Sequence, residues 1–250
     1  MKIIGVIPAR YKSSRFPGKP LADICGRPMI WWVYNQVKKV ESIDEVYVAT
    51  DNKEIMDTCS QLNIRCIMTG DDIGTSTERA FEVAKKVSGD LYIVINGDEP
   101  LINPDVISKI IPEKIEDDNS IYVRNLMTSI SNPVEVVDFT NIKVVTDSKS
   151  NALFMSRSPI PYPKSSVNYL YYKHVGVLAY NFNALKFFAE TPKGYNEKIE
   201  DVNELRFIEN DIPLNMVEVE AHSLSVDTPK DLEYVRSVIK EKIDSGEIVL

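Results

Sequence analysis

A cluster of basic side chains follows the first apolar segment of this sequence. The segment IPARYKSSRFPGKPL spans residues 7–21 and carries Arg10, Lys12, Arg15 and Lys19 between prolines and a glycine. Arginine offers a two-pronged hydrogen-bond donor and lysine a point charge, and both suit phosphate groups. Backbone N–H groups of such a loop can also point at an anion. The residue types therefore predict a di- or triphosphate site, although a solvated surface loop can have the same composition.

Acidic side chains form a second candidate site. In VINGDEP, Asp98 and Glu99 come directly after an apolar segment, where a carboxylate needs a positive partner to offset its desolvation. Mg²⁺ that bridges substrate phosphates is one such partner. A turn in which Asp98 bonds its own backbone is an equally good interpretation. A second acidic turn, SVDTPKDLEYV, places Asp227 where it can cap the helix that opens with Thr228 and Pro229, or bind a metal.

Composition limits the classes of partner. The 250 residues carry a net charge of -8, which argues against binding to nucleic acid or to an anionic membrane surface. No segment approaches the roughly 20 apolar residues of a membrane span. The three cysteines form no CxxC pair, so we expect reduced thiols and a cytoplasmic protein. The basic loop contains neither GxxxxGK[ST] nor GxGxxG, so it is neither a P-loop nor a dinucleotide fingerprint.

The elements that position these side chains alternate between strand and helix over the first hundred residues. The pattern predicts strands over 2–8, 45–50, 64–68 and 91–96, and helices over 28–40 and 77–87. Apolar strands separated by helices are typical of a parallel sheet covered on both faces. Ligands of such sheets lie beyond the carboxyl ends of the strands. We therefore expect the loops 8–20, 69–77 and 96–100 to converge on one site.

The second half of the chain has a different rhythm. From about residue 120, strand-like segments follow one another without long helices, which predicts a mixed, partly antiparallel continuation of the sheet. Two helices are expected near 199–209 and 229–243. No linker rich in Gly, Ser or Pro separates the halves, so we expect one domain over residues 1–250, with halves at 1–118 and 119–250.

Six segments resemble one known family in their order and approximate spacing. They are IPARYKSSRFPGKPL, TSTER, NGDEP, SRSPIP, KHVGVLAY and VDTPKDLE, and the family is that of the CMP-Kdo synthetases, the 3-deoxy-manno-octulosonate cytidylyltransferases. The resemblance covers essentially the whole chain. It implies a Rossmann-like nucleotidyltransferase fold with a mostly parallel mixed sheet. It also implies that a hydroxyl of a sugar acid attacks the α-phosphorus of CTP, with Mg²⁺ as cofactor and pyrophosphate as leaving group.

The resemblance assigns roles to individual residues. The implied catalytic residues are Arg10, Lys19 and Asp98, and the implied metal ligands are Asp98 and Asp227. The implied nucleotide-binding residues are Pro8, Ala9, Arg10, Arg15, Lys19, Ser76, Thr77, Arg79 and Asp98. The implied residues on the sugar-acid side are Asn96, Arg157, His174, Asn203 and Glu204. Residues 1–118 would thus bind the nucleotide, and residues 119–250 would bind the acid and form a homodimer through strands near 120–175.

Two of the acceptor-side residues can also be interpreted from their residue types alone. Arg157 suits this role because a guanidinium can grip a carboxylate with two hydrogen bonds. His174 is as well explained as a hydrogen-bonded histidine of a strand.

The sequence departs from the family pattern on the acceptor side. Asn96 stands where the family has Gln, Ile73 where it has His, and Asn203 and Glu204 where it has Glu and Gln. These changes fit either drift within a Kdo-activating enzyme or a preference for another acid. An amino-substituted Kdo would suit the extra carboxylate of Glu204. A phosphorylated acceptor is a further alternative substrate. A non-catalytic nucleotide-binding protein is disfavoured, because the phosphate-binding bases and the two aspartates are all present.

Overall fold

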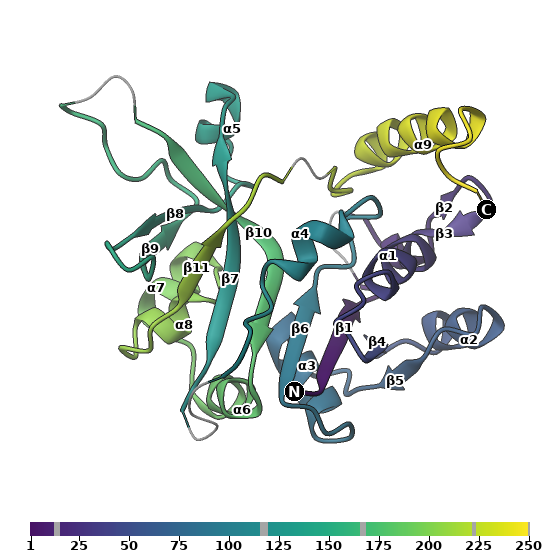
Figure 1. Ribbon diagram of the computed structural model, residues 1–250, viewed down its shortest axis with the longest axis horizontal. Coiled ribbons are helices and arrows are strands. Elements are labelled where there is room, and N and C mark those ends of the chain that lie inside the picture. The colour runs from purple at the N-terminus through teal and green to yellow at the C-terminus, as the bar shows by residue number, and fades with distance from the viewer. Residues whose placement is uncertain (13–15, 116–119, 166–168, 222–223, 250) are drawn as a thin grey trace.

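The computed structural model describes residues 1–12, 16–115, 120–165, 169–221 and 224–249. The strands of the main sheet are β1 (Ile3–Ala9), β4 (Glu45–Thr50), β5 (Cys66–Met68), β6 (Leu91–Ile95), β7 (Val123–Ile130), β8 (Lys143–Thr146), β9 (Ala152–Ser156), β10 (Tyr171–Tyr180) and β11 (Asn215–Glu218). Within the described ranges these nine strands form one sheet in the order β11-β7-β10-β6-β1-β4-β5, which β8 and β9 extend from β10 (Figure 1).

The direction of the strands changes at one seam. β1, β4, β5 and β6 are mutually parallel, whereas β10 lies antiparallel to β6, β7 and β8. β11 then runs parallel to β7. The predicted α/β fold, with a parallel first half and a partly antiparallel second half, is confirmed.

Helices cover both faces of this sheet. They are α1 (Met29–Lys38), α2 (Lys53–Gln61), α3 (Ser76–Ala84), α4 (Pro104–Ser108), α5 (Pro133–Val137), α6 (Phe182–Glu190), α7 (Tyr195–Glu200), α8 (Leu205–Ile208) and α9 (Pro229–Asp244). Successive side chains of a strand point to opposite faces. Ile3 and Ile7 of β1 accordingly pack with residues of α1 and α2, while Ile4 and Val6 pack with residues of α3 and α6. No helix among the described residues has the length and apolarity needed to cross a membrane.

The structure corrects three helix predictions. The helix expected over 199–209 is two short helices, α7 and α8, because Asp201 between them is left-handed with φ of 50°. Helix α6 was not predicted; it begins where the side chain of Asn181 accepts a hydrogen bond from the Ala184 N–H. The cap of α9 is Thr228, which forms a capping box with Asp231, and Asp227 is therefore not the cap.

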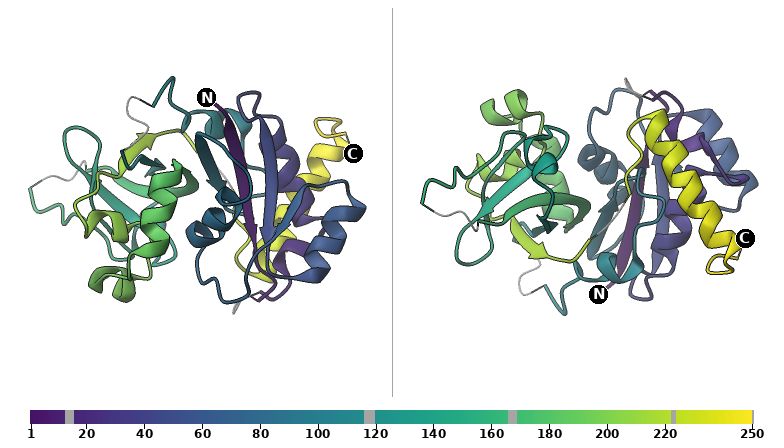
Figure 2. Two further views of the ribbon diagram at one scale, coloured as in Figure 1. Left: turned by 90° about the horizontal axis from the view of Figure 1, so that it is seen from below. Right: turned by 90° about the horizontal axis from the view of Figure 1, so that it is seen from above.

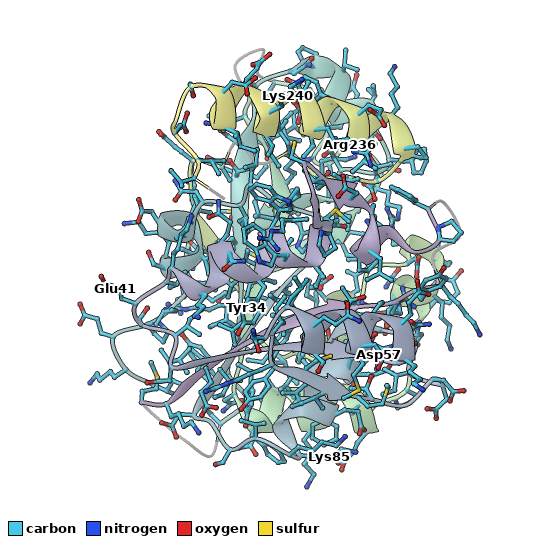
Figure 3. The ribbon with its side chains drawn as sticks, turned by 90° about the vertical axis from the view of Figure 1, so that its right-hand side faces the viewer. Tyr34, Glu41, Asp57, Lys85, Arg236 and Lys240 are labelled. Atoms are coloured by element: carbon cyan, nitrogen blue, oxygen red, sulfur yellow. The ribbon has the colours of Figure 1, made fainter. Side chains whose placement is uncertain are left out.

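The last helix returns to the first half of the chain. α9 packs through Leu232, Val235 and Ile239 against a cluster that contains Ile24 and Met29. Ile24 belongs to the hairpin of β2 (Asp23–Ile24) and β3 (Arg27–Pro28). Figure 3 views this side, with Arg236 and Lys240 labelled on α9. The C-terminal helix was expected within the second half, over 119–250, but it packs against the first half. Figure 2 shows the two halves on either side of the seam between β6 and β10.

Candidate functional site

A polar cavity of about 580 Å³ lies where β1 and β6 end. All three loops predicted to converge there line it. The first contributes Pro8, Ala9, Arg10 and Lys19, the second Gly74, Thr75 and Ser76, and the third Asn96, Gly97 and Asp98. Because parallel strands end at the same edge of a sheet, the chain order of the strands was sufficient to predict this meeting.

The basic loop turns back on itself before it reaches the cavity. Gly18 has φ of 71°, a left-handed conformation that glycine adopts without steric cost. Its N–H donates to the carbonyl of Tyr11 at 2.8 Å. The 3₁₀ helix η1 (Lys19–Leu21) follows directly, with Pro20 in its first turn. This reversal places Lys19 beside the end of β6. Arg15 lies outside the described residues, so its predicted role stays a prediction.

Lys19 joins the two predicted metal aspartates. Its Nζ lies 3.1 Å from Asp98 Oδ2 and 3.8 Å from Asp227 Oδ1. It also donates to the carbonyl of Val226 at 2.9 Å. The backbone carbonyl of Asp98 in turn accepts from the Val226 N–H at 2.8 Å. The positive partner that the sequence demanded for Asp98 is therefore Lys19, and segments 79 and 207 residues away from it meet at this ammonium.

The same carboxylates fit a hard divalent cation. Asp98 and Asp227 converge on a single positive charge, and both side chains are partly open, with exposures of 26% and 32%. Among the residues that the structure describes, no group of three or more His, Cys, Asp or Glu side chains could hold a metal. Mg²⁺ typically takes one or two carboxylates and fills its other positions with phosphate and water oxygens. The pair thus suits a metal that arrives together with phosphates.

The N-terminus of α3 forms the opposite wall. Thr75 caps this helix, and its side chain and that of Glu78 bond each other's backbone N–H groups. Ser76 and Thr75 line the cavity at the helix end, where free N–H groups and the helix dipole favour an anion. Arg10 closes this wall, since its Nη1 donates to the carbonyl of Gly74 at 2.9 Å. The arrangement brings a cation and a helix N-terminus to the same side of the cavity.

Two predicted nucleotide-binding side chains have different surroundings from those expected. Arg79 is fully buried; it donates to the Thr69 hydroxyl and pairs with Asp51 at 3.1 Å. Burial lowers the pKa of Arg79, and the charge of Asp51 opposes that shift. The hydroxyl of Thr77 lies 3.4 Å from that of Tyr180 in the core. Arg79 lines the cavity, but its hydrogen bonds to Thr69 and Ile73 hold the loop before α3 in place. Thr77 does not line the cavity.

The predicted acceptor residues divide between two places. Asn203 lines the main cavity, whereas His174 lines a smaller one of about 150 Å³. Asn96 and Asp98 line both, so the two cavities adjoin. Asn96 packs closely over Gly176 of β10, where a Cβ atom would lie 2.4 Å from its Nδ2.

His174 is held as one tautomer. Its Nδ1 lies 2.7 Å from Oδ1 of Asn125, a side chain that is fully buried. The Nδ2 of Asn125 donates to the carbonyls of Val175 and Val177, which fixes Oδ1 as the acceptor. Nδ1 of His174 therefore carries the proton, and Nε2 is left as an acceptor. Burial lowers the pKa of His174 despite nearby carboxylates, so the ring is neutral near pH 7. The prediction of a hydrogen-bonded strand histidine is confirmed.

The guanidinium of Arg157 has backbone partners within the chain. Its Nε donates to the carbonyl of Glu200 at 2.6 Å, its Nη1 to that of Phe139 at 3.1 Å, and its Nη2 to that of Asp201 at 3.0 Å. It lines neither cavity. The guanidinium instead ties α7 to the segment before β8.

Glu204 is the most unusual of the acceptor-side residues. It is 7% exposed, and its carboxylate makes no hydrogen bond or ion pair with any described residue. Its charge reaches two neighbours, since it opposes the lowering of the pKa of His174 and helps to raise the pKa of buried Tyr180. Glu204 itself lines neither cavity, so the structure does not bring its carboxylate to the space in which a ligand would bind.

Two charged residues of the cavity were not predicted from the sequence. Lys193 and Asp201 reach it from the segments before and after α7. Neither lies in a motif or follows a strand, so only the tertiary fold brings them to the site. Asp201 carries the left-handed φ of 50° noted above.

Known proteins resemble this chain in sequence and in structure. Residues 4–218 match the family described as cytidylyltransferase. A 3-deoxy-manno-octulosonate cytidylyltransferase of Escherichia coli is 39% identical over 242 residues, covering 97% of this chain and 98% of that protein. One of Trichlorobacter lovleyi is 37% identical over 252 residues, covering 96% and 100%.

A solved structure extends the similarity to the fold. It is described as CMP:2-keto-3-deoxy-manno-octonic acid synthetase complexed with CTP, and it superposes with a TM-score of 0.89 at 38% identity. The match covers 97% of this chain and 100% of that one. The predicted resemblance is confirmed, and the chain belongs to the cytidylyltransferase family, among the 3-deoxy-manno-octulosonate cytidylyltransferases.

Proposed function

We propose that this enzyme transfers CMP from CTP to a hydroxyl of a 3-deoxy sugar acid of the Kdo type and releases pyrophosphate, with Mg²⁺ as cofactor. The observation that carries the proposal is the single cavity in which Arg10, the N-terminus of α3 and the paired carboxylates Asp98 and Asp227 lie together. The names of the relatives support the nucleotide and the acid, since they describe a CTP complex and Kdo cytidylyltransferases.

The residues of the chain act by positioning and by neutralising charge. Arg10 and the N–H groups at the start of α3 would hold the phosphates, and Asp98 and Asp227 would hold the metal. The metal, when bound, would offset the charge that develops at the α-phosphate. His174 would accept a hydrogen bond from an acceptor hydroxyl through Nε2, because Asn125 leaves that nitrogen unprotonated. An in-line displacement of this kind needs no covalent nucleophile.

Pyrophosphate release tests the proposal directly. The enzyme is mixed with CTP, Mg²⁺ and one acid at a time from a panel of Kdo, an amino-substituted Kdo and phosphorylated small acids. We expect turnover only when a 3-deoxy sugar acid and Mg²⁺ are both present, and none after chelation with EDTA. A nucleotide other than CTP serves as the matched control. If no acid of the panel stimulates pyrophosphate release, the proposed function is wrong.

The buried carboxylate of Glu204 favours a second candidate acceptor. Its charge acts on His174, which lines the smaller cavity, although Glu204 itself lines neither cavity. An ammonium of a substrate bound beside His174 would be attracted by this charge, whereas unmodified Kdo carries no positive group. An amino-substituted 3-deoxy sugar acid is therefore the alternative substrate.

Glu204→Gln separates the two acceptors. For an amino-substituted acid, the loss of the charge pair should lower kcat/KM by about 10- to 100-fold, which is about 1.4 to 2.7 kcal/mol. For Kdo, the neutral amide should leave kcat/KM unchanged or raise it. The control is Glu220→Gln, because Glu220 is exposed and, unlike Glu204, has no part in the pKa shifts of His174 and Tyr180. If the wild-type enzyme already has a higher kcat/KM for Kdo than for the amino-substituted acid, the alternative substrate is ruled out.

The assembly and location of the enzyme are also proposals. A homodimer through residues near 120–175 is supported by large apolar side chains exposed in this stretch, such as Val137, Phe139 and Tyr162, with exposures of 70%, 68% and 87%.

A cytoplasmic location is supported by cysteines that are all free thiols, although Cys59 and Cys66 pack close together.

A further inference from the structure

Lys19 lies where a metal ion would otherwise be needed. Its ammonium contacts the carboxylates of Asp98 and Asp227 and the carbonyl of Val226, at 3.1, 3.8 and 2.9 Å. Its side chain is only 17% exposed, so water screens these contacts weakly. The acidic pair is thus already neutralised in part by a residue of the chain itself.

A divalent cation and this ammonium cannot share the pair at no cost. A metal bound to the Asp98 oxygen that Lys19 contacts would lie about 2 Å from that oxygen, and hence within about 5 Å of Nζ in its present position. Two like charges at such a distance repel strongly in a partly buried site. Without three or more acidic or His ligands in the described part of the site, the protein offers little else to offset that repulsion.

The cavity provides another place for the ammonium. Lys19 lines the same cavity as Arg10 and Ser76, which form the opposite wall that suits an anion. The side chain of Lys19 is a flexible four-carbon stem, and its backbone is held in η1. Nζ can therefore move without a change of fold. Phosphate oxygens in the cavity would therefore compete with the two aspartates for Lys19.

We propose that Lys19 is the internal counter-ion of the nucleotide-free enzyme, and that phosphates of the nucleotide must draw it away before the aspartates accept a metal. Binding is then ordered, with the nucleotide first and the metal with it or after it. The inference rests on the magnesium part of the proposed function. It adds that Lys19 weakens metal binding in the free enzyme and couples metal binding to the nucleotide.

Metal binding without turnover tests this role. Free Mn²⁺ is measured by electron paramagnetic resonance with wild type, Lys19→Met and Lys19→Arg, each with and without CTP and with no acceptor. We expect Lys19→Met to bind Mn²⁺ at least about tenfold more tightly than wild type when CTP is absent. Lys19→Arg keeps the charge and should stay within about twofold of wild type. CTP should tighten Mn²⁺ binding more in wild type than in Lys19→Met.

Controls separate this inference from the function on which it rests. Circular dichroism confirms that each variant is folded, and Lys19→Met combined with Asp98→Asn should lose the gain in affinity. Equal Mn²⁺ affinity of wild type and Lys19→Met without CTP would overturn the counter-ion role and leave the proposed function intact. A gain that survives Asp98→Asn would also overturn it. If no protein binds Mn²⁺ even with CTP, both the inference and the magnesium site are wrong.

Discussion

Asp98→Asn lowers kcat for pyrophosphate release by at least about 1,000-fold, which corresponds to about 4 kcal/mol of transition-state stabilisation. The amide keeps the shape of the side chain but removes the charge that would hold the metal beside the phosphates. It also removes one of the two carboxylates that Lys19 now contacts. Asp227→Asn should have a similar effect, because its carboxylate faces the same ammonium. The measurement is steady-state kinetics at saturating CTP, acid and Mg²⁺.

The folded structure should survive this substitution. The side chain of Asp98 is 26% exposed and lies at the end of a strand, so its replacement leaves no cavity in the core. Asp71→Asn is the matched control, since Asp71 is exposed in a neighbouring loop and lines neither cavity. The control should keep wild-type kinetics. An Asp98→Asn enzyme that retains more than roughly a tenth of wild-type kcat would contradict the metal assignment.

Arg206→Met is expected to have the largest effect on stability. Arg206 is 1% exposed, donates to both carboxylate oxygens of Glu197 at 2.8 and 2.5 Å, and lies 3.7 Å above the ring of Phe188. Its Nη1 also donates to the carbonyls of Phe188 and Thr191. Its removal leaves the buried carboxylate of Glu197 without its cation. Such losses destabilise proteins by about 3 to 5 kcal/mol, or roughly 6 to 20 °C in Tm for a chain of this size.

A double-mutant cycle separates the contribution of the Arg206–Glu197 ion pair from the cost of leaving one buried charge unpaired. Arg206→Met with Glu197→Met should be less destabilised than Arg206→Met alone, because no unpaired charge then stays buried. Arg65→Met is the surface control: its side chain is 57% exposed, and its pair with Glu45 should contribute less than about 1 kcal/mol. Thermal unfolding gives both comparisons. A Tm of Arg206→Met within the error of the Arg65→Met value would show that the buried pair is dispensable.

The parts of the fold that the sequence predicts well are those with strong local signals. The strand over 45–50 has the predicted limits, because an apolar run there is bounded by polar residues on both sides. The meeting of three loops followed from the parallel order of the strands alone. The basic loop and the acidic turn were therefore placed correctly in one cavity before any side-chain contact was known.

The acceptor side was harder to predict because its residues are fixed by tertiary contacts. The hydrogen bonds of Arg157 go to three carbonyls from two separate segments, and no local pattern in the sequence signals such partners. Arg79 likewise looks like a phosphate ligand by residue type, but Asp51 and Thr69 from the loops beside it bury its charge. Charged residues near a site can thus serve its architecture, and composition does not distinguish the two roles.

The return of the chain through α9 makes the segment between α4 and Val226 a single insert in the first half. The chain leaves the first half after α4 and rejoins it at Val226, whose N–H bonds the carbonyl of Asp98. One contiguous insert therefore carries β7 to β11, and it joins its host sheet along the ladder between β10 and β6. A chimaera that keeps this ladder, such as the pairing of Val177 with Ile95, could exchange the insert for that of a relative. Such an exchange would replace most of the smaller cavity and also Lys193, Asp201 and Asn203 of the main cavity, so it would measure how far the insert alone sets acceptor choice.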